Sequence, residues 1–264
     1  MANLFFILFL ISFGASVIGA VCGIGGGVII KPVLDTLNIA GVAEISFLSG
    51  CTVLCMSCYS VGKALLAKES LVRFQTGTPL AAGAAAGGIL GKSLFSALQS
   101  MVAQPEQVGG YQAICLTIVT IATLVYILNK KHIRTLHVTH AAVCIGVGLC
   151  LGVMSSFLGI GGGPINLVVL YFFFSMDTKE AAQNSLYIIV ISQFTSLLTT
   201  IISGKLPEFH LLWLAVMAFG GITGGMAGRK INKHLSAPQI DKLFIRLIIL
   251  IICISCYNAW RFLK

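Results

Sequence analysis

The sequence predicts an all-α polytopic membrane protein with about eight transmembrane helices in two homologous halves, each containing a Gly-rich broken or re-entrant helix. Only 9% of the 264 residues are charged and 57% are hydrophobic. In a soluble domain about a quarter of the residues are charged. Charge-free segments recur at lengths near the roughly 20 apolar residues that cross a bilayer. A five-residue string, Gly-Ile-Gly-Gly-Gly, also occurs twice, at 23–27 and 159–163.

The two copies of the string lie 136 positions apart, and other residues follow the same offset. The further matches are Glu44 with Glu180, Ser49 with Ser185 and, at an offset of 137, Gly87, Gly88 and Gly91 with Gly224, Gly225 and Gly228. Internal duplication around interrupted apolar segments is typical of secondary transporters. We therefore predict an N-terminal repeat at 1–128, a basic linker at 129–137 and a C-terminal repeat at 138–264. An even number of crossings per repeat would make the repeats parallel, and an odd number would make them inverted.

The individual spans follow from the charge-free segments in chain order. The first has no basic residue before its apolar run, and its Gly-rich string recurs deep in the chain, so we interpret it as a mature membrane segment and not as a signal peptide. The eight predicted spans are 3–22, 44–64, 75–98, 108–128, 138–158, 181–203, 209–228 and 243–262. Two pieces that directly follow the strings, 28–39 and 164–175, are too short to cross.

The segment 135–176 indicates where a helix must break. It holds 42 residues without a charge, which as one helix would be about 63 Å long, roughly twice the thickness of the hydrocarbon core. Three adjacent glycines are poor helix formers, and Pro164 suits the first turn of a new helix. We therefore predict a break at 159–164 and an equivalent one at the first string, where Lys31-Pro32 follows.

The charges lie mostly in short predicted loops. The chain has 17 Lys and Arg against 8 acids, a net charge of +9, which we interpret as membrane-orientation signals and not as a nucleic-acid surface. Clusters fall on both alternate sets of loops, although the linker and the C-terminal Arg261 and Lys264 favour both ends of the chain in the cytoplasm. A further loop is predicted at 99–110, around Pro105.

No residue pattern indicates an enzyme, so no catalytic residue is assigned. The sequence has no HExxH or GxSxG motif, and its nine Cys include two pairs at metal-type spacing, Cys55 with Cys58 and Cys253 with Cys256. Both pairs lie in apolar helical segments without nearby His or acidic ligands, so small apolar filling is the expected role. No metal and no cofactor is expected.

The Gly-rich strings predict an anion site. The N-terminus of a broken helix presents N–H donors and partial positive charge, and glycine lets an anion approach the backbone closely. Two breaks converging near the bilayer midplane could bind one anion. The candidate substrate-binding residues are Gly23, Gly25, Gly26, Gly27, Ser49, Gly159, Gly161, Gly162, Gly163, Asn166, Asn184 and Ser185. The polar members, and Gln183 and Gln193 beside them, could instead be hydrogen bonds between helices.

Other glycines and titratable residues have plainer expected roles. Glycines repeating every four residues, at Gly83-x-x-x-Gly87-x-x-x-Gly91 and Gly221-x-x-x-Gly225, are expected to pack helices closely. Lys31 could bind an anion, extend to the interface or pair with Asp35 at i+4. Glu44 and Glu180 suit the positive end of a helix, although a proton relay stays an alternative. His140 and His210 are expected at helix starts near the interface, and His140 could instead relay protons.

The two strings with their flanking residues, Ser49 and Asn184-Ser185-Leu186 resemble the TauE/SafE sulfite and sulfonate exporter family over nearly the whole chain. The segment 41–50 follows that family's pattern only loosely. The resemblance implies a carrier of small sulfur-containing anions in the cytoplasmic membrane, coupled to a proton or another ion. The alternatives are a carrier of amino acids or cations, an intramembrane enzyme and an accessory membrane protein. Substrate identity, direction, coupling ion and oligomeric state stay open.

Overall fold

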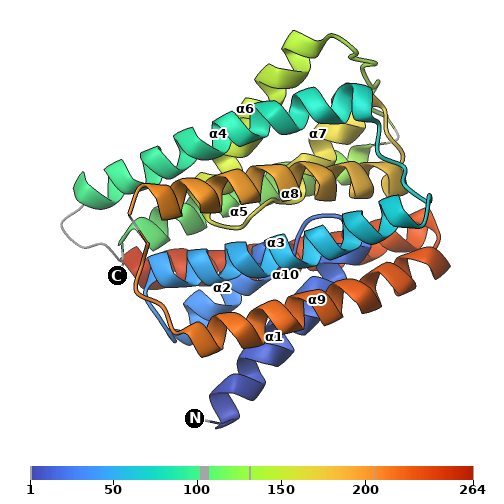
Figure 1. The fold of residues 1–264 in the computed structure, drawn as a ribbon. Coiled ribbons are helices and arrows are strands. Elements are labelled where there is room, and N and C mark those ends of the chain that lie inside the picture. Colours follow the sequence, from blue (N-terminus) through green and yellow to red (C-terminus); the bar gives the residue numbers. More distant parts are fainter. Residues whose placement is uncertain (1, 102–106, 131, 205, 264) are drawn as a thin grey trace.

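The chain folds into a bundle of long helices (Figure 1). The computed structural model describes residues 2–101, 107–130, 132–204 and 206–263. Within these residues there are ten helices: α1 (Ala2–Cys22), α2 (Gly27–Leu37), α3 (Val42–Leu66), α4 (Phe74–Met101), α5 (Gln107–Asn129), α6 (Ala141–Leu158), α7 (Pro164–Phe174), α8 (Thr178–Ile202), α9 (Leu211–His234) and α10 (Ala237–Leu263). The all-α prediction is confirmed.

Eight of the described helices are long and apolar enough to cross a membrane, as predicted, and α2 and α7 are the two shorter pieces. Most bounds agree with the predicted spans within a few residues. The predicted loop at 99–110 is wrong at both of its ends, because α4 continues to Met101 and α5 already begins at Gln107. Pro105 and Lys131 lie outside the described residues. Large apolar side chains such as Phe6, Ile118 and Phe219 are exposed on the outside, as a lipid-facing surface requires.

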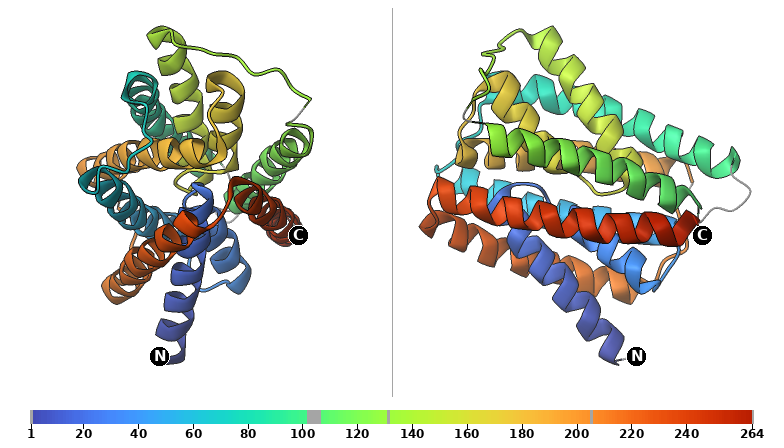
Figure 2. Two further views of the ribbon diagram at one scale, coloured as in Figure 1. Left: turned by 90° about the vertical axis from the view of Figure 1, so that its right-hand side faces the viewer. Right: turned by 180° about the vertical axis from the view of Figure 1, so that it is seen from behind.

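The helices run between two ends of the bundle, which we name after Glu44 and Glu180 (Figures 1 and 2). At the Glu44 end, the backbone N–H of His210 before α9 donates to the Glu44 carboxylate at the start of α3. At the Glu180 end, the guanidinium of Arg73 before α4 pairs with the Glu180 carboxylate in the first turn of α8. Helices α3, α4, α5, α8, α9 and α10 connect these ends.

The remaining helices form two hairpins. Helix α1 starts at the Glu44 end, and α2 returns there, since Leu4, Ile39 and Phe209 belong to one apolar cluster. Helix α6 starts at the Glu180 end, and α7 returns there, since the backbone N–H groups of Leu136 and Val138 donate to carbonyls at the end of α7. Each five-helix segment therefore holds one hairpin and three helices that run from end to end, and α1 and α6 start at opposite ends.

Glycines allow close packing between the hairpins and the long helices. A Cβ on Gly83, Gly87 or Gly91 of α4 would overlap carbonyl groups of α6, those of Ile145, Leu149 and Val153. In the same way, Gly220, Gly224 and Gly228 of α9 face the carbonyls of Phe9, Phe13 and Val17 of α1. The predicted packing role of Gly83, Gly87 and Gly91 is confirmed. Gly221 and Gly225 also pack closely, against Thr52 and Met56 of α3.

Candidate substrate site

The two Gly-rich strings form the turns of the hairpins. Gly23, Gly25, Gly159 and Gly161 all have φ between 65° and 77°, and Gly162 has φ 137°. Residues with a side chain rarely adopt this left-handed backbone region, so glycine is the residue type that makes these turns without strain. Pro164 is in the first turn of α7, as predicted. Neither α2 nor α7 has a side-chain cap, unlike α8, where the Glu180 N–H in the first turn donates to the Asp177 carboxylate. The first-turn N–H groups of both short helices therefore lack a side-chain acceptor.

The strings touch each other in the middle of the bundle. A Cβ on Gly27 would overlap the carbonyl group of Ile160, and one on Gly162 would lie 3.6 Å from the carbonyl oxygen of Ile24. Apolar side chains complete this contact, because Val53 of α3 lies against Gly25 and Ile189 of α8 lies against Gly162. The space between the strings is therefore packed. An anion that contacts a string must do so at its flank.

A cavity reaches such a flank from the Glu44 end. This first vestibule has a volume of about 530 Å³. Its lining includes seven hydroxyl side chains, one cation and, among these described lining residues, no acid. The cation is Lys92 of α4. Next to the vestibule is a small chamber of about 10 Å³ against Gly159, large enough for roughly one water molecule.

Lys92 and Ser46 line both the vestibule and the chamber, so they mark the junction of the two. The Ser46 hydroxyl is buried, and the structure gives it no hydrogen-bond partner. It lies directly beside Gly159, where a Cβ would come within 2.6 Å of Ser46 Oγ. Gln193 of α8 also lines the chamber, and its amide contacts Gly161. A cation, a free hydroxyl and an amide thus surround one flank of the second string.

A second vestibule of about 290 Å³ opens at the Glu180 end. Its lining includes Arg229 and Lys233 of α9, Lys179 of α8 and Glu69 of the loop before α4. Glu69 pairs with Arg229 at 2.6 Å and with Lys233 at 2.7 Å. The hydrogen bond from Lys233, together with that from Arg229, holds the pKa of the Glu69 carboxyl below its usual value. Arg229 and Lys233 therefore already have a carboxylate partner, which Lys92 does not have among the described residues that line its own vestibule.

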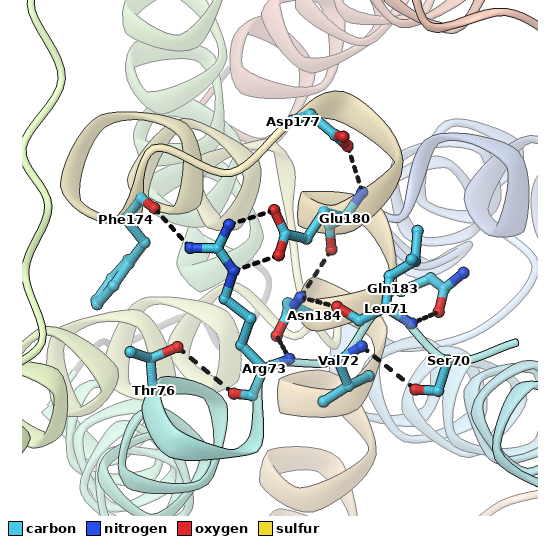
Figure 3. A network of polar contacts seen from close by, with 10 residues as sticks. All are labelled: Ser70, Leu71, Val72, Arg73, Thr76, Phe174, Asp177, Glu180, Gln183 and Asn184. Atoms are coloured by element: carbon cyan, nitrogen blue, oxygen red, sulfur yellow. Dashed lines mark hydrogen bonds and ion pairs between the residues drawn. The ribbon is translucent and has the colours of Figure 1, made fainter. Parts of the chain in front are cut away.

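The structure brings some of the predicted polar residues near the centre and places others elsewhere. Ser49, Ser185 and Asn166 are buried, and each has a side-chain oxygen without a partner. Asn184 instead ties the loop before α4 to α8: it donates to the Leu71 carbonyl and accepts from the Arg73 N–H (Figure 3). Its hydrogen bonds are thus used in holding the bundle together. Gln183 has a similar role, because its side-chain oxygen accepts a hydrogen bond from the Leu71 N–H.

The predicted titratable residues mostly take the plainer role. Lys31 pairs with Asp35 at 2.9 Å, and both side chains are almost fully buried. Lys31 Cε also lies 3.4 Å from the position of a Cβ on Gly159, so this ion pair adjoins the chamber. Glu180 is in the first turn of α8 and pairs with Arg73. His140 and His210 are exposed at the starts of α6 and α9.

Sequence reasoning did not single out Lys92 and Ser46, which line the junction of the vestibule and the chamber. A signal for Lys92 was present, because Lys92 follows Gly91 just as Arg229 follows Gly228 at the offset of 137. Ser46 had no such signal, since the repeat aligns it with Ala182. Among the described residues, no group of three or more His, Cys, Asp or Glu side chains is arranged to hold a metal ion.

Comparison with known proteins adds a family and several relatives. The family model described as "Sulfite exporter TauE/SafE" matches residues 8–254. The chain is 24% identical over 279 residues to the "Probable membrane transporter protein YunE" of Bacillus subtilis (strain 168), covering 97% of this chain and 98% of that protein. It is also 31% identical over 132 residues to a "Probable membrane transporter protein" of Xylella fastidiosa strain Temecula1, covering 47% of this chain and 48% of that protein. No solved structure matches the chain at a significant level.

Proposed function

The chain belongs to the sulfite exporter TauE/SafE family, and from that premise we propose that it carries small sulfur-containing anions, such as sulfite or organosulfonates, across the cell membrane. Its family and its relatives make it a multi-pass membrane transporter. We place the anion at the junction of the first vestibule and the chamber, between Lys92, Ser46 and the flank of Gly159. This location replaces the space between the two strings, which Val53 and Ile189 fill.

The observation that carries this proposal is the position of Lys92. A half-buried ammonium group in a cavity lined by hydroxyl side chains attracts an anion, and the low-dielectric surroundings strengthen that attraction. The Ser46 hydroxyl can donate to an oxyanion, which would give this buried group its missing partner. Sulfite and sulfonates present three oxygens that accept such hydrogen bonds, so two donors on different helices can hold one anion.

The pairing of helices supports an origin of the fold by duplication and inversion. Exchanging α1–α5 with α6–α10 leaves the main contacts unchanged: α4 packs on α6 as α9 packs on α1, and α5 packs on α10. The same exchange maps the first vestibule onto the second and places Lys92 at the position of Arg229. We therefore propose alternating access, in which the anion reaches the centre first through one vestibule and then through the other.

The charges also suggest an orientation. The linker and the C-terminus lie at opposite ends of the bundle, so they cannot both mark the cytoplasm (Figure 2). Basic residues gather at the Glu180 end, among them Lys68, Arg73, Lys130, Arg134, Lys179, Arg229, Lys230 and Lys233. Cytoplasmic loops carry an excess of Lys and Arg. We propose that the Glu180 end faces the cytoplasm and that both chain termini lie outside, which for the termini is the reverse of the orientation expected from the linker and the C-terminus.

The test is transport by the purified protein in proteoliposomes, with sulfite, methanesulfonate and sulfate as anions, zwitterionic alanine as a substrate without net charge and choline as a cation. We expect flux of at least one sulfur anion, and a loss of about tenfold or more in the Lys92→Gln variant. The matched control is Lys242→Gln, which removes the same charge from an exposed position on α10. Equal flux in Lys92→Gln and the control would place the anion elsewhere, and flux of alanine or choline alone would favour the rival class of substrate.

A further inference from the structure

The second vestibule contains a carboxylate where the first has open space. In the first, Lys92 stands one residue after Gly91, which packs α4 against the carbonyl of Val153. In the second, Arg229 stands one residue after Gly228, which packs α9 against the carbonyl of Val17. The two cations thus have equivalent positions in the two halves of the bundle. Lys233, one turn after Arg229, adds a second cation at the Glu180 end.

The Glu69 carboxylate binds this pair of cations as an external anion would. It accepts a hydrogen bond from Arg229 Nη2 at 2.6 Å and another from Lys233 at 2.8 Å. Arg229 is held in position from its other side, because Nη1 donates to the Ser60 carbonyl at 3.1 Å. A fixed guanidinium next to an ammonium is an arrangement suited to a planar or tetrahedral oxoanion.

Glu69 lies on a connection and not on a helix, so it can leave these cations without a helix having to move. The connection spans residues 67–73 and includes Lys68, whose φ of 54° is in the left-handed region. The next residues fasten it to α8: the N–H groups of Leu71 and Arg73 donate to Gln183 and Asn184 (Figure 3). About half of the Glu69 side chain is exposed. The carboxylate is therefore held at the mouth of the cavity by a short tether.

We infer that Arg229 and Lys233 form a second binding site for the transported oxoanion, and that the Glu69 carboxylate occupies it as an internal competitor. This inference rests on the proposed function, because it assigns the same class of anion to both vestibules. A sulfite or sulfonate leaving the centre towards the Glu180 end would displace Glu69 and take over its two hydrogen bonds. When the anion departs, Glu69 returns and neutralises the cations, which limits rebinding.

Binding to the purified protein in lipid nanodiscs tests this site, with methanesulfonate as the probe because its charge is fixed over the working pH range. We expect the Glu69→Gln variant to bind methanesulfonate about tenfold more tightly than the unmodified protein, since two cations lose their internal partner. Adding Arg229→Gln to that variant should abolish the gain. Glu69→Asp keeps the charge on a shorter side chain, so it should bind with intermediate affinity.

The matched control is Glu208→Gln, which removes one acid from the exposed loop before α9 at the opposite end. An equal gain in methanesulfonate affinity in Glu208→Gln would mean that the effect comes from overall charge and not from the site. No gain in affinity in Glu69→Gln would overturn the second site. These results are distinct from a failure of the proposed function. In that case the unmodified protein would transport no sulfur anion in proteoliposomes, or its flux would not depend on Lys92.

Discussion

Gly27 and Ile160 belong to different hairpins, yet they are so close that a Cβ on Gly27 would lie 2.7 Å from the carbonyl carbon of Ile160. This contact joins the start of α2 to the second Gly-rich string. No flexible side chain separates the two backbones, so an added methyl group must push the hairpins apart. The centre of the bundle is therefore a backbone-to-backbone junction.

Substituting Gly27→Ala should destabilise the protein by about 1–3 kcal/mol, the usual cost of overpacking a core. It should also reduce anion flux, because the junction joins both hairpins next to the chamber. Thermal unfolding and proteoliposome flux check the two effects together. Gly41→Ala is the control, since a Cβ on Gly41 meets no atom within 4 Å.

The Gly161→Ala variant should weaken anion binding more than it weakens the fold. At the Gly161 φ of 72°, a residue other than glycine is strained by about 1–2 kcal/mol. A Cβ there would also overlap the Gln193 amide that lines the chamber. Gly161→Leu, like Gly25→Leu, should abolish transport but still insert into the membrane. The control is Gly146→Ala, where a Cβ meets open space, and which should gain up to about 1 kcal/mol of helix propensity. Normal binding by Gly161→Ala would remove the second string from the site.

Gly87→Leu should lower the yield of folded protein before it affects any transport rate. Gly87 packs α4 on the Leu149 carbonyl of α6, and a large side chain there must separate the two helices. Folded yield can be measured as the monodisperse fraction after extraction in detergent. Gly14→Leu adds the same side chain on α1, where a Cβ has no neighbour within 4 Å, so its yield should be normal.

Asp35→Ala should destabilise the protein by about 3–5 kcal/mol, because it leaves the Lys31 ammonium buried without a partner. The double variant Lys31→Met with Asp35→Leu should recover most of that loss. For comparison, Asp241→Ala breaks the more exposed Lys130–Asp241 pair and should cost only about 0–1 kcal/mol. Unfolding titrations of all three variants measure these differences. Equal losses for Asp35→Ala and Asp241→Ala would mean that water reaches the Lys31 pair.

Acid should release the connection that carries Glu69. Its carboxyl has a pKa below the usual 4.5 because Lys233, and then Arg229, hydrogen-bond to it, while Lys179 lines the same cavity. A lowered pKa means that the ion pairs are fully present above pH 4.5 and are lost as the pH falls through the lowered value. Amide hydrogen exchange at residues 67–70, which precede the two amides bonded to α8, should therefore accelerate relative to its intrinsic rate only at acidic pH. In Glu69→Gln the exchange should be fast at every pH, and unchanged exchange in that variant would contradict this role.

The lengths of the charge-free apolar segments were sufficient to predict the helices, because a bilayer demands long apolar segments whatever their partners are. The predicted loop at 99–110 overlapped both neighbouring helices, because α4 continues to Met101 and because Gly109 and Gly110 lie buried inside α5. The importance of the strings for the turns could also be predicted, since three adjacent glycines disfavour a helix interior. The proposed site could not be predicted, because Lys92 and Ser46 lie on different helices that only the tertiary packing brings together.

The order of synthesis delays the assembly of this bundle. Helix α1 is made first, but the carbonyls of Phe9, Phe13 and Val17 find their glycine partners on α9, the penultimate helix. At about 5–20 residues per second, that partner leaves the ribosome on the order of ten seconds or more after α1. During this interval the first hairpin must rest in lipid or against a membrane chaperone, and its Gly-rich turn lacks the second string until residues 159–163 are made. Slowing or splitting translation at residues 129–140 should therefore hardly affect assembly, because the completing contacts cannot form before the second half arrives.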